Sequence, residues 1–300
     1  MKVKIKKDLY QDFTDQVIKQ MENNNMNWFK PFTTSILNGH HNVVSKKCYQ
    51  GLNCFSIGLS VHNNGFKSNE WATFNQWKNL GANVLKGSKG TQILYWNIKE
   101  YEDKNDKDKK VKIPMLKYFV VFNADQVEGY KTKEIETKEI DDWKAHFKTD
   151  TFVKNTKANI QVNNKAFYSP SGDFIGMPPK EDFKGDKENT KEQHYYSTLL
   201  HELTHWTGHS SRCNRDLQNR FGSKAYAMEE LVAEIGSAFL CSHLGITKAP
   251  TPNHAKYLNN WLEVLKEDKK AIFKAFSLSK VSSEHLLELD QIETKEKKVA

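Results

Sequence analysis

Apolar side chains recur at helical spacing in the first third of the chain. One helical face near the start is formed by four of them, Phe13, Val17, Ile18 and Met21. This pattern predicts an amphipathic helix. A second helix is expected through Leu59 and Val61, and a third over residues 71–77, because Trp71, Phe74 and Trp77 recur at helical spacing.

Alternating apolar positions further along predict strands. Residues 91–98 and 116–122 are rich in β-branched and aromatic side chains, which favours a β-hairpin. The charged run between them, residues 102–110, holds no apolar residue and is expected to be a solvated loop. A second hairpin is predicted by residues 166–168 and 174–178. We expect Phe174 to Met177 to be an edge strand that pairs with an extended peptide.

The sequence His201-Glu202-Leu203-Thr204-His205 supplies the chemistry of a zinc hydrolase. Residues four apart share a helical face, so His201 and His205 can bind one metal ion while Glu202 activates a water molecule as a base. Catalytic zinc normally has three protein ligands and one open position, so a third ligand is needed. Glu230 fits this need. Glu234, one turn later, can accept the second ring N–H of a ligand histidine.

These two glutamates lie in a predicted helix over residues 226–240, with Ser223 as N-cap and Gly245 as its stop. Their spacing resembles the pattern of gluzincins, the thermolysin-like metallopeptidases.

Other ligand sets stay open from the sequence. Glu229, Glu234 and His209 are alternatives to Glu230, and His209 as a fourth ligand would make the site structural. The metzincin pattern, with a third histidine six residues after His205, is excluded because serine stands there. Two ordinary core histidines in a chance motif are the remaining alternative, and the spaced carboxylates of the second helix argue against it.

Peptide hydrolysis needs a further donor for the developing oxyanion. His254 and Tyr257, in a helix expected after Thr251-Pro252, are candidates, although packing or capping is the more common role for such residues. The three arginines fall between the two motif helices and can contact DNA, a partner or surface carboxylates: Arg212, Arg215 and Arg220.

Composition indicates a folded protein with two domains. Three hundred residues suffice for two cores, and 38% hydrophobic with 12% aromatic residues is typical of globular chains. The four cysteines form no CxxC pair, the basic N-terminus is followed by no apolar signal segment, and no run could span a membrane. These features favour a reduced, cytoplasmic setting without membrane association.

Positive charge is concentrated in the first part of the chain. Residues 1–130 hold 19 lysines and no arginine against 12 acidic residues, whereas the remainder holds 26 basic and 25 acidic residues. Lysines interleaved with aromatic rings suit single-stranded nucleic acid, because lysines follow the phosphates and rings stack on bases. A lysine-rich surface that serves only solubility is the alternative. The candidate contacts, which flank predicted turns, are Trp28, Lys46, Tyr49, Lys86 and Lys89.

Ordered motifs along nearly the whole chain resemble ArdC-type antirestriction proteins. They include W-x-K-P-F, K-x-Y-x-G-x-N and V-F-N-x-x-Q-x-E-G, then A-F-Y-x-P-x-x-D-x-I-x-M-P, H-E-L-T-H-W-T-G-H and E-E-L-V-A-E-I-G. The resemblance implies a domain that binds single-stranded DNA and a zincin-like metallopeptidase domain. It also implies a protein that is encoded on plasmids, phages and other mobile elements and is able to blunt host restriction. Departures from the pattern are Cys213, where an aliphatic residue is usual, and Phe32, where tryptophan is common.

We therefore expect an α+β protein with a single-stranded-DNA-binding domain over residues 1–130, a charged linker over 131–150 and a gluzincin-type domain over 151–300. The leading function is antirestriction, with Zn²⁺ as cofactor and single-stranded DNA as partner. The first alternative is a zinc protease that acts on host proteins or a restriction-system component and uses DNA only for targeting. The second is a non-catalytic DNA-binding protein with a structural zinc.

Overall fold

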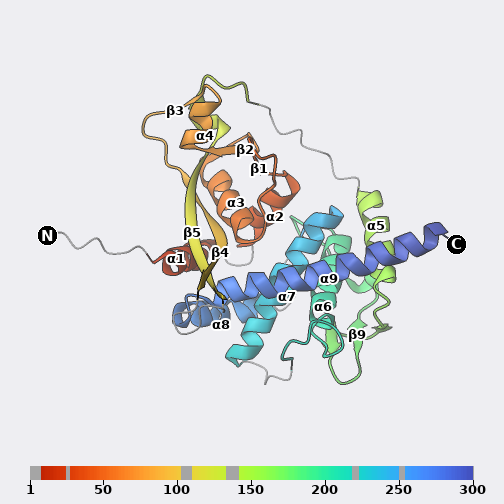
Figure 1. The fold of residues 1–300 in the computed structure, drawn as a ribbon. Helices are drawn as coiled ribbons and strands as arrows, with labels where there is room; N and C mark the ends of the chain where they lie inside the picture. The colour runs from red at the N-terminus through yellow and green to blue at the C-terminus, as the bar shows by residue number, and fades with distance from the viewer. Residues whose placement is uncertain are drawn as a thin grey trace. The chain divides into compact units, whose positions relative to one another are not determined.

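The computed structural model describes residues 8–24, 28–102, 110–132, 142–217, 223–249 and 254–299. They form two compact units, each of mixed helix and sheet, as the predicted α+β class requires (Figure 1). Residues 1–37 with 138–300 make up the helical unit, and residues 38–137 make up the sheet unit.

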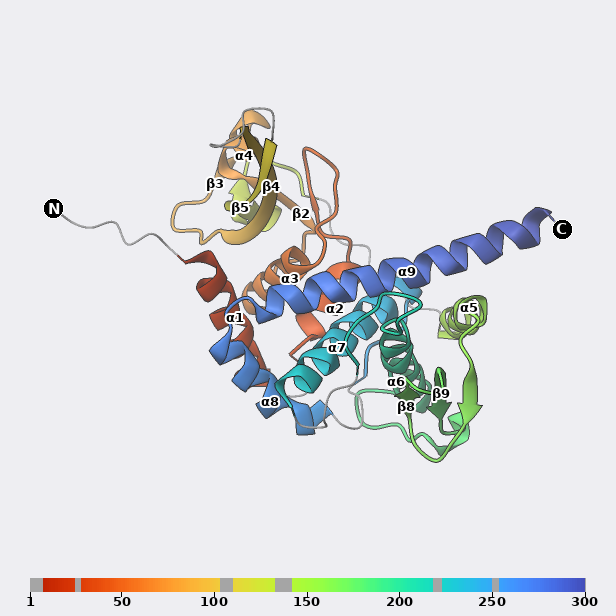
Figure 2. The ribbon, with the colours of Figure 1, turned by 60° about the horizontal axis from the view of Figure 1, so that its bottom comes forward.

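The helical unit is organised around two helices in contact, α6 (Lys191–Trp206) and α7 (Lys224–Leu244). Helix α9 (Ala271–Val299) runs along α7, as Figures 1 and 2 both show. The other helices of the unit are α1 (Leu9–Asn24), α2 (Lys30–Leu37), α5 (Asp142–Asn155) and α8 (His254–Glu267). A small sheet in contact with α6 has the strand order β7 (Ile160–Val162), β9 (Phe174–Met177), β8 (Phe167–Ser169).

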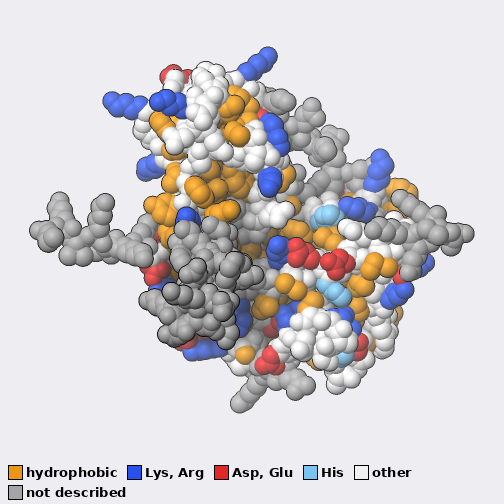
Figure 3. Space-filling model, in the orientation of Figure 1, with side chains coloured by type: hydrophobic (Ala, Val, Ile, Leu, Met, Phe, Trp, Pro, Cys, Tyr) orange, Lys and Arg blue, Asp and Glu red, His pale blue; other side chains and the backbone are white. Residues whose placement is uncertain are grey.

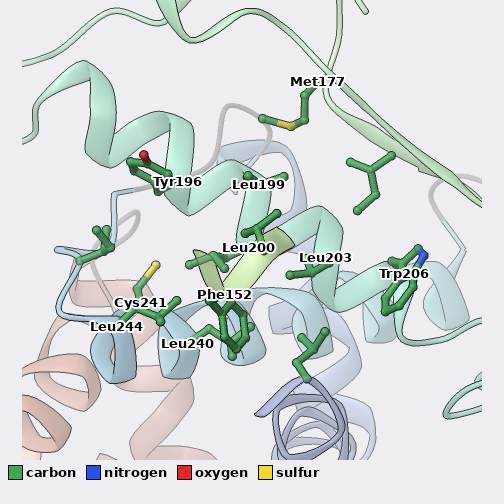
Figure 4. Close-up of a cluster of buried hydrophobic side chains, with 14 of the residues drawn as sticks. Phe152, Met177, Tyr196, Leu199, Leu200, Leu203, Trp206, Leu240, Cys241 and Leu244 are labelled. Atoms are coloured by element: carbon green, nitrogen blue, oxygen red, sulfur yellow. The ribbon is translucent and has the colours of Figure 1, made fainter. Parts of the chain in front are cut away.

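The core of this unit lies between α5, α6 and α7 (Figure 4). Leucines of α6 face α7 across it, with Phe152 of α5 beside them. Gly236 allows the two helices to approach closely, because a β-carbon there would lie 2.6 Å from the Thr204 Cγ2 atom. Any larger residue at 236 would push α7 away from α6.

Residues 8–24 and 28–37 pack within the helical unit. Helix α1 confirms the predicted amphipathic helix, and its apolar face is buried. Aromatic edge contacts join this segment to the last two helices through the pairs Phe13–Phe273, Trp28–Trp261 and Phe32–Phe276. The compact units therefore differ from the expected limits at residues 130 and 150, and α5 begins inside the expected linker. Contacts between segments so distant in sequence leave no local pattern.

The sheet unit contains a four-stranded sheet of order β1-β2-β5-β4 and a two-stranded sheet of β3 and β6. The strands are β1 (His41–Asn42), β2 (Glu70–Thr73), β3 (Asn83–Val84), β4 (Thr91–Glu102), β5 (Lys110–Asn123) and β6 (Val127–Glu128). Helices α3 (Leu52–Asn64) and α4 (Phe74–Asn79) complete the unit. The hairpin prediction is confirmed by β4 and β5, which extend into the charged run; residues 103–109 lie outside the described residues.

The predicted helix over residues 71–77 is wrong in its first part. Trp71 lies in β2, which pairs with both β1 and β5, and α4 begins only at Phe74. Thr73 caps α4 by accepting a hydrogen bond from the Gln76 N–H. Strand pairing with distant residues outweighs the local helical spacing here.

A buried histidine makes the stability of the sheet unit depend on pH. The Trp71 Nε1–H donates to His40 Nδ1 over 3.0 Å, and burial lowers the pKa of His40 to about 4. In the unfolded chain the His40 imidazole binds a proton below about pH 6.5, whereas in the folded unit it binds one only below about pH 4. The contribution of neutral His40 to the free energy of unfolding is therefore complete above pH 6.5, and it is lost as the pH falls from 6.5 to 4.

We expect acidification from pH 7 to 4.5 to cost roughly 2–3 kcal/mol through His40 alone. His40→Gln keeps an acceptor for Trp71 but cannot titrate, so its free energy of unfolding should vary less with pH. Urea unfolding followed by tryptophan fluorescence measures both variants. Identical pH dependence in the two proteins would contradict the assignment.

Candidate metal centre

Three side chains converge where α6 meets α7. A capping box between Thr190 and Gln193 starts α6, which places His201 and His205 on one face with their Nε2 atoms 3.2 Å apart. Ser223 caps α7 and Gly245 ends it, as the sequence predicted. Glu230 Oε2 lies 3.4 Å from His201 Nε2, and Glu230 Oε1 lies 3.5 Å from His205 Nε2.

This geometry fits a divalent cation. Zinc ligands at about 2.0–2.1 Å in a tetrahedral arrangement lie about 3.3 Å from one another. The three candidate ligand atoms lie within 4.8 Å of one another, and the closest pairs match this spacing. Both imidazoles direct the same ring nitrogen to one point, where a cation can bind both lone pairs.

Charge in the site favours a cation as well. Burial lowers the pKa of the His201 imidazole, but hydrogen bonds to Glu230 and Glu234 outweigh burial and raise it to about 9. Hydrogen bonds to Glu229 and Glu230 likewise overcome burial and raise the pKa of His205 to about 10. The carboxylates therefore stabilise positive charge between them, which protons or a metal ion can supply.

Each histidine has a second carboxylate behind it. His205 Nδ1 lies 3.1 Å from Glu229 Oε1, and His201 Nδ1 lies 3.5 Å from Glu234 Oε2. Glu229 and Glu234 thus contact the ring nitrogens that point away from the ligand atoms. Such contacts orient a histidine and increase its basicity. Glu229 and Glu234, the alternative third ligands, therefore do not lie between the two Nε2 atoms, where Glu230 lies.

Glu202 is buried beside the histidines. Burial raises the pKa of its carboxyl above the usual range, although the nearby histidines oppose the shift. The backbone N–H of Tyr168 donates to this carboxylate. A glutamate with an elevated pKa is better matched to proton transfer near neutral pH than an ordinary one.

A cavity of about 930 Å³ opens onto these residues. Its walls include Phe167, Tyr226 and Tyr257 as well as the three candidate ligands and Glu202. The hydroxyls of Tyr226 and Tyr257 lie 3.2 Å apart, and Tyr226 also hydrogen-bonds to Glu230. Tyr257 was expected from the sequence, and Tyr226 was missed. Its position four residues before Glu230 on the same helix is the signal that could have found it.

Other predicted residues lie elsewhere. The His209 residue is half-buried and its Nδ1 contacts the Ser211 hydroxyl, and it is not among the three side chains that converge as candidate ligands. Arg212 pairs with Asp173, and Arg215 pairs with Glu229, so both are internal salt bridges. The side chain of His254 and the whole of Arg220 lie outside the described residues.

The expected edge strand is corrected by the sheet order. Strand β9 (Phe174–Met177) is central, because β7 pairs with one side of it and β8 with the other. A central strand has no open hydrogen-bonding edge. Strand β8 is an edge of this sheet in the described part of the chain, and its residues Phe167 and Tyr168 line the cavity.

The candidate DNA contacts divide into two groups. The prediction that Trp28 contacts DNA is contradicted, because its side chain is 1% exposed and packs against Trp261 in the helical unit. Tyr49 packs on the core of the sheet unit, and burial raises its pKa to about 12. The lysines among the candidates are exposed on the sheet unit: Lys46, Lys86 and Lys89.

Comparison with known proteins agrees with this architecture. The family described as the N-terminal domain of anti-restriction factor ArdC matches residues 7–122, and a zincin-like metallopeptidase family matches residues 147–278. The metal-free crystal structure of the antirestriction protein ArdC from plasmid R388 has a TM-score of 0.76 and 34% identity, covering 95% of this chain and 98% of that one. The chain belongs to the ArdC family of antirestriction proteins. The resemblance and the two-domain class inferred from the sequence are confirmed.

Other relatives of this ArdC-type chain include proteins of similar length and one much longer protein. The Mn(II)-bound structure of R388 ArdC matches with a TM-score of 0.74. An uncharacterized protein, y4eC of Sinorhizobium fredii, is 32% identical over 90% of this chain and 88% of its own length. DNA primase TraC of Escherichia coli is 33% identical over 97% of this chain, which spans only 28% of TraC.

Within the described residues of this ArdC-type protein, no helix is both long and apolar enough to cross a membrane.

We expect the 300-residue chain to bind one divalent ion. His201→Ala or Glu230→Ala should weaken binding at least 100-fold, because each removes one of three ligands. Competition with a chromophoric chelator measures the affinity. Glu202→Gln and His209→Ala serve as controls and should retain the metal. Loss of metal from the His209 variant would contradict the three-ligand site.

Proposed function

We propose that this ArdC-type protein protects incoming DNA from restriction, binding single-stranded DNA with its sheet unit and hydrolysing a protein with its helical unit. The observation that carries the catalytic part is the juxtaposition of His201, His205 and Glu230 with the buried base Glu202 in one cavity. Family membership supports antirestriction as the biological outcome.

Zinc suits the His₂Glu donor set, and the Mn(II)-bound relative supports manganese as a second possible ion. The bound ion would polarise the scissile carbonyl and acidify a water molecule. Glu202 would act as the base that takes a proton from an attacking water molecule and returns it to the leaving amine. Tyr226 and Tyr257 line the same cavity, and in this proposal a hydroxyl of the pair donates to the developing oxyanion.

Strand β8 is the surface on which an extended substrate would pair. It is an edge of the small sheet in the described part of the chain, its residues Phe167 and Tyr168 line the cavity, and the Tyr168 N–H donates to Glu202. The strand is held from behind, since the Tyr168 hydroxyl donates to Asp173, which pairs with Arg212. Backbone pairing with a fixed edge selects extended peptides without demanding a particular sequence.

Exposed aromatic rings on the sheet unit support binding of unpaired bases. Figure 3 shows hydrophobic side chains gathered over β4 and β5 of this unit. Tyr95 is 51% exposed and Phe119 is 45% exposed. Their rings meet edge to face, with the ring centroids 5.8 Å apart. Lys117 is opposite Tyr95 in the hairpin register, and residues 38–137 hold 15 lysines and no arginine against 10 acidic residues. Rings with lysines beside them suit stacked bases and their phosphates.

We expect the full-length protein to bind a single strand more tightly than its duplex, with affinity that falls steeply as salt rises. Replacing Tyr95 and Phe119 together by alanine should weaken binding about tenfold or more, since each stacked base contributes about 1–3 kcal/mol. Fluorescence anisotropy with labelled DNA measures this. Phe74→Ala, a 54% exposed ring on α4 of the same unit, is the matched control. Equal losses in the two variants would reject the hairpin surface.

For the catalytic part, Glu202→Gln should abolish protection of a plasmid entering a restricting host, because the amide cannot accept the proton of the attacking water. Survival of the incoming plasmid is the measurement. Glu192→Gln, in the first turn of the same helix, is the control and should protect fully. Full protection by the Glu202 variant, with metal and DNA still bound, would reject proteolysis as the cause.

A further inference from the structure

A fully buried lysine lies behind the metal centre. Lys248 Nζ is 3.1 Å from Glu234 Oε1, and both side chains are 0% exposed. The other oxygen of Glu234 lies 3.5 Å from His201 Nδ1. The three side chains therefore form a line that leads from the ligand histidine into the interior of the helical unit.

A buried carboxylate next to a histidine requires a counter-charge, because an unpaired charge in the interior is costly. The other histidine shows the same arrangement. His205 contacts Glu229, and Glu229 pairs with Arg215, whose side chain is 4% exposed. Arg215 is fixed by further hydrogen bonds to Thr207 and Ser282. Lys248 is the counterpart of Arg215 on the His201 side.

Lys248 is itself held in place from two directions. Its ammonium donates to the Ala249 carbonyl, and the Ala249 N–H donates to Ser197 of α6. On another side the ammonium lies 5.0 Å from the centre of the Phe29 ring, a distance at which a cation is attracted to an aromatic face. Phe29 lies within residues 7–122, which the ArdC N-terminal family matches, but it belongs to the helical unit.

We propose that Lys248, seated against Phe29, is a positioning residue that holds Glu234 on His201 and so sets the metal affinity of the site. The proposal rests on the proposed role of His201 as a ligand. Without Lys248 the Glu234 carboxylate is an uncompensated buried charge and moves away from the ring. His201 then loses the contact that orients it and increases its basicity.

The test measures Zn²⁺ affinity of the full-length protein by chelator competition, together with the visible absorption of bound Co²⁺. Lys248→Met is expected to weaken zinc binding about 10–100-fold and to shift the cobalt spectrum. Phe29→Leu, which keeps an apolar contact but removes the ring, should fall between this variant and the wild type. Lys280→Met is the matched control, because Lys280 pairs with Glu284 on the exposed face of α9, and it should change neither property.

Lys248→Met leaves a charge buried, so the double variant Lys248→Met with Glu234→Gln, which removes both charges, is measured beside it. The double variant is expected to fold and to bind zinc more weakly than the wild type, yet no more weakly than Lys248→Met. Affinity within about twofold of wild type in the double variant, or in a folded Lys248→Met, overturns the proposal. Wild-type affinity in Phe29→Leu overturns the role of the N-terminal segment. Failure of the wild-type protein to bind zinc would instead refute the proposed metal site.

Discussion

The close approach of α6 and α7 at Gly236 is the constraint on which the site depends. A β-carbon at this position would lie 2.6 Å from Thr204, which stands one residue before His205. The histidines come from one helix and Glu230 from the other, so the spacing of the helices sets the distances between the three candidate ligands. Leucines packed between the same two helices keep that spacing rigid.

Charge balance is the second requirement of this interior. Four carboxylates gather around two imidazoles: Glu202, Glu229, Glu230 and Glu234. Two of them are neutralised from behind by Arg215 and Lys248, both almost fully buried. The remaining negative charge faces the cavity, where a divalent ion can balance it. Buried ions persist in proteins only when paired in this way.

The boundary between the two units does not follow the order of the chain. Residues 8–24 and 28–37 fold against α8 and α9 through aromatic contacts, and the sheet unit follows them in the chain. The N-terminal ArdC family spans both parts, from residue 7 to 122. The helical unit, which holds the candidate metal centre, therefore includes a segment that belongs to the N-terminal ArdC family by sequence.

Local sequence patterns were enough to predict two histidines four apart on a helix, a second helix with spaced carboxylates between Ser223 and Gly245, and two hairpins. Periodicity and caps act within a few residues, so they are readable locally. Only long-range packing makes β9 central, buries Trp28, and brings Tyr226 to Tyr257 and Lys248 to Glu234. These outcomes depend on which distant segments pack together, and the free energy of that packing has no signature in any short window of sequence.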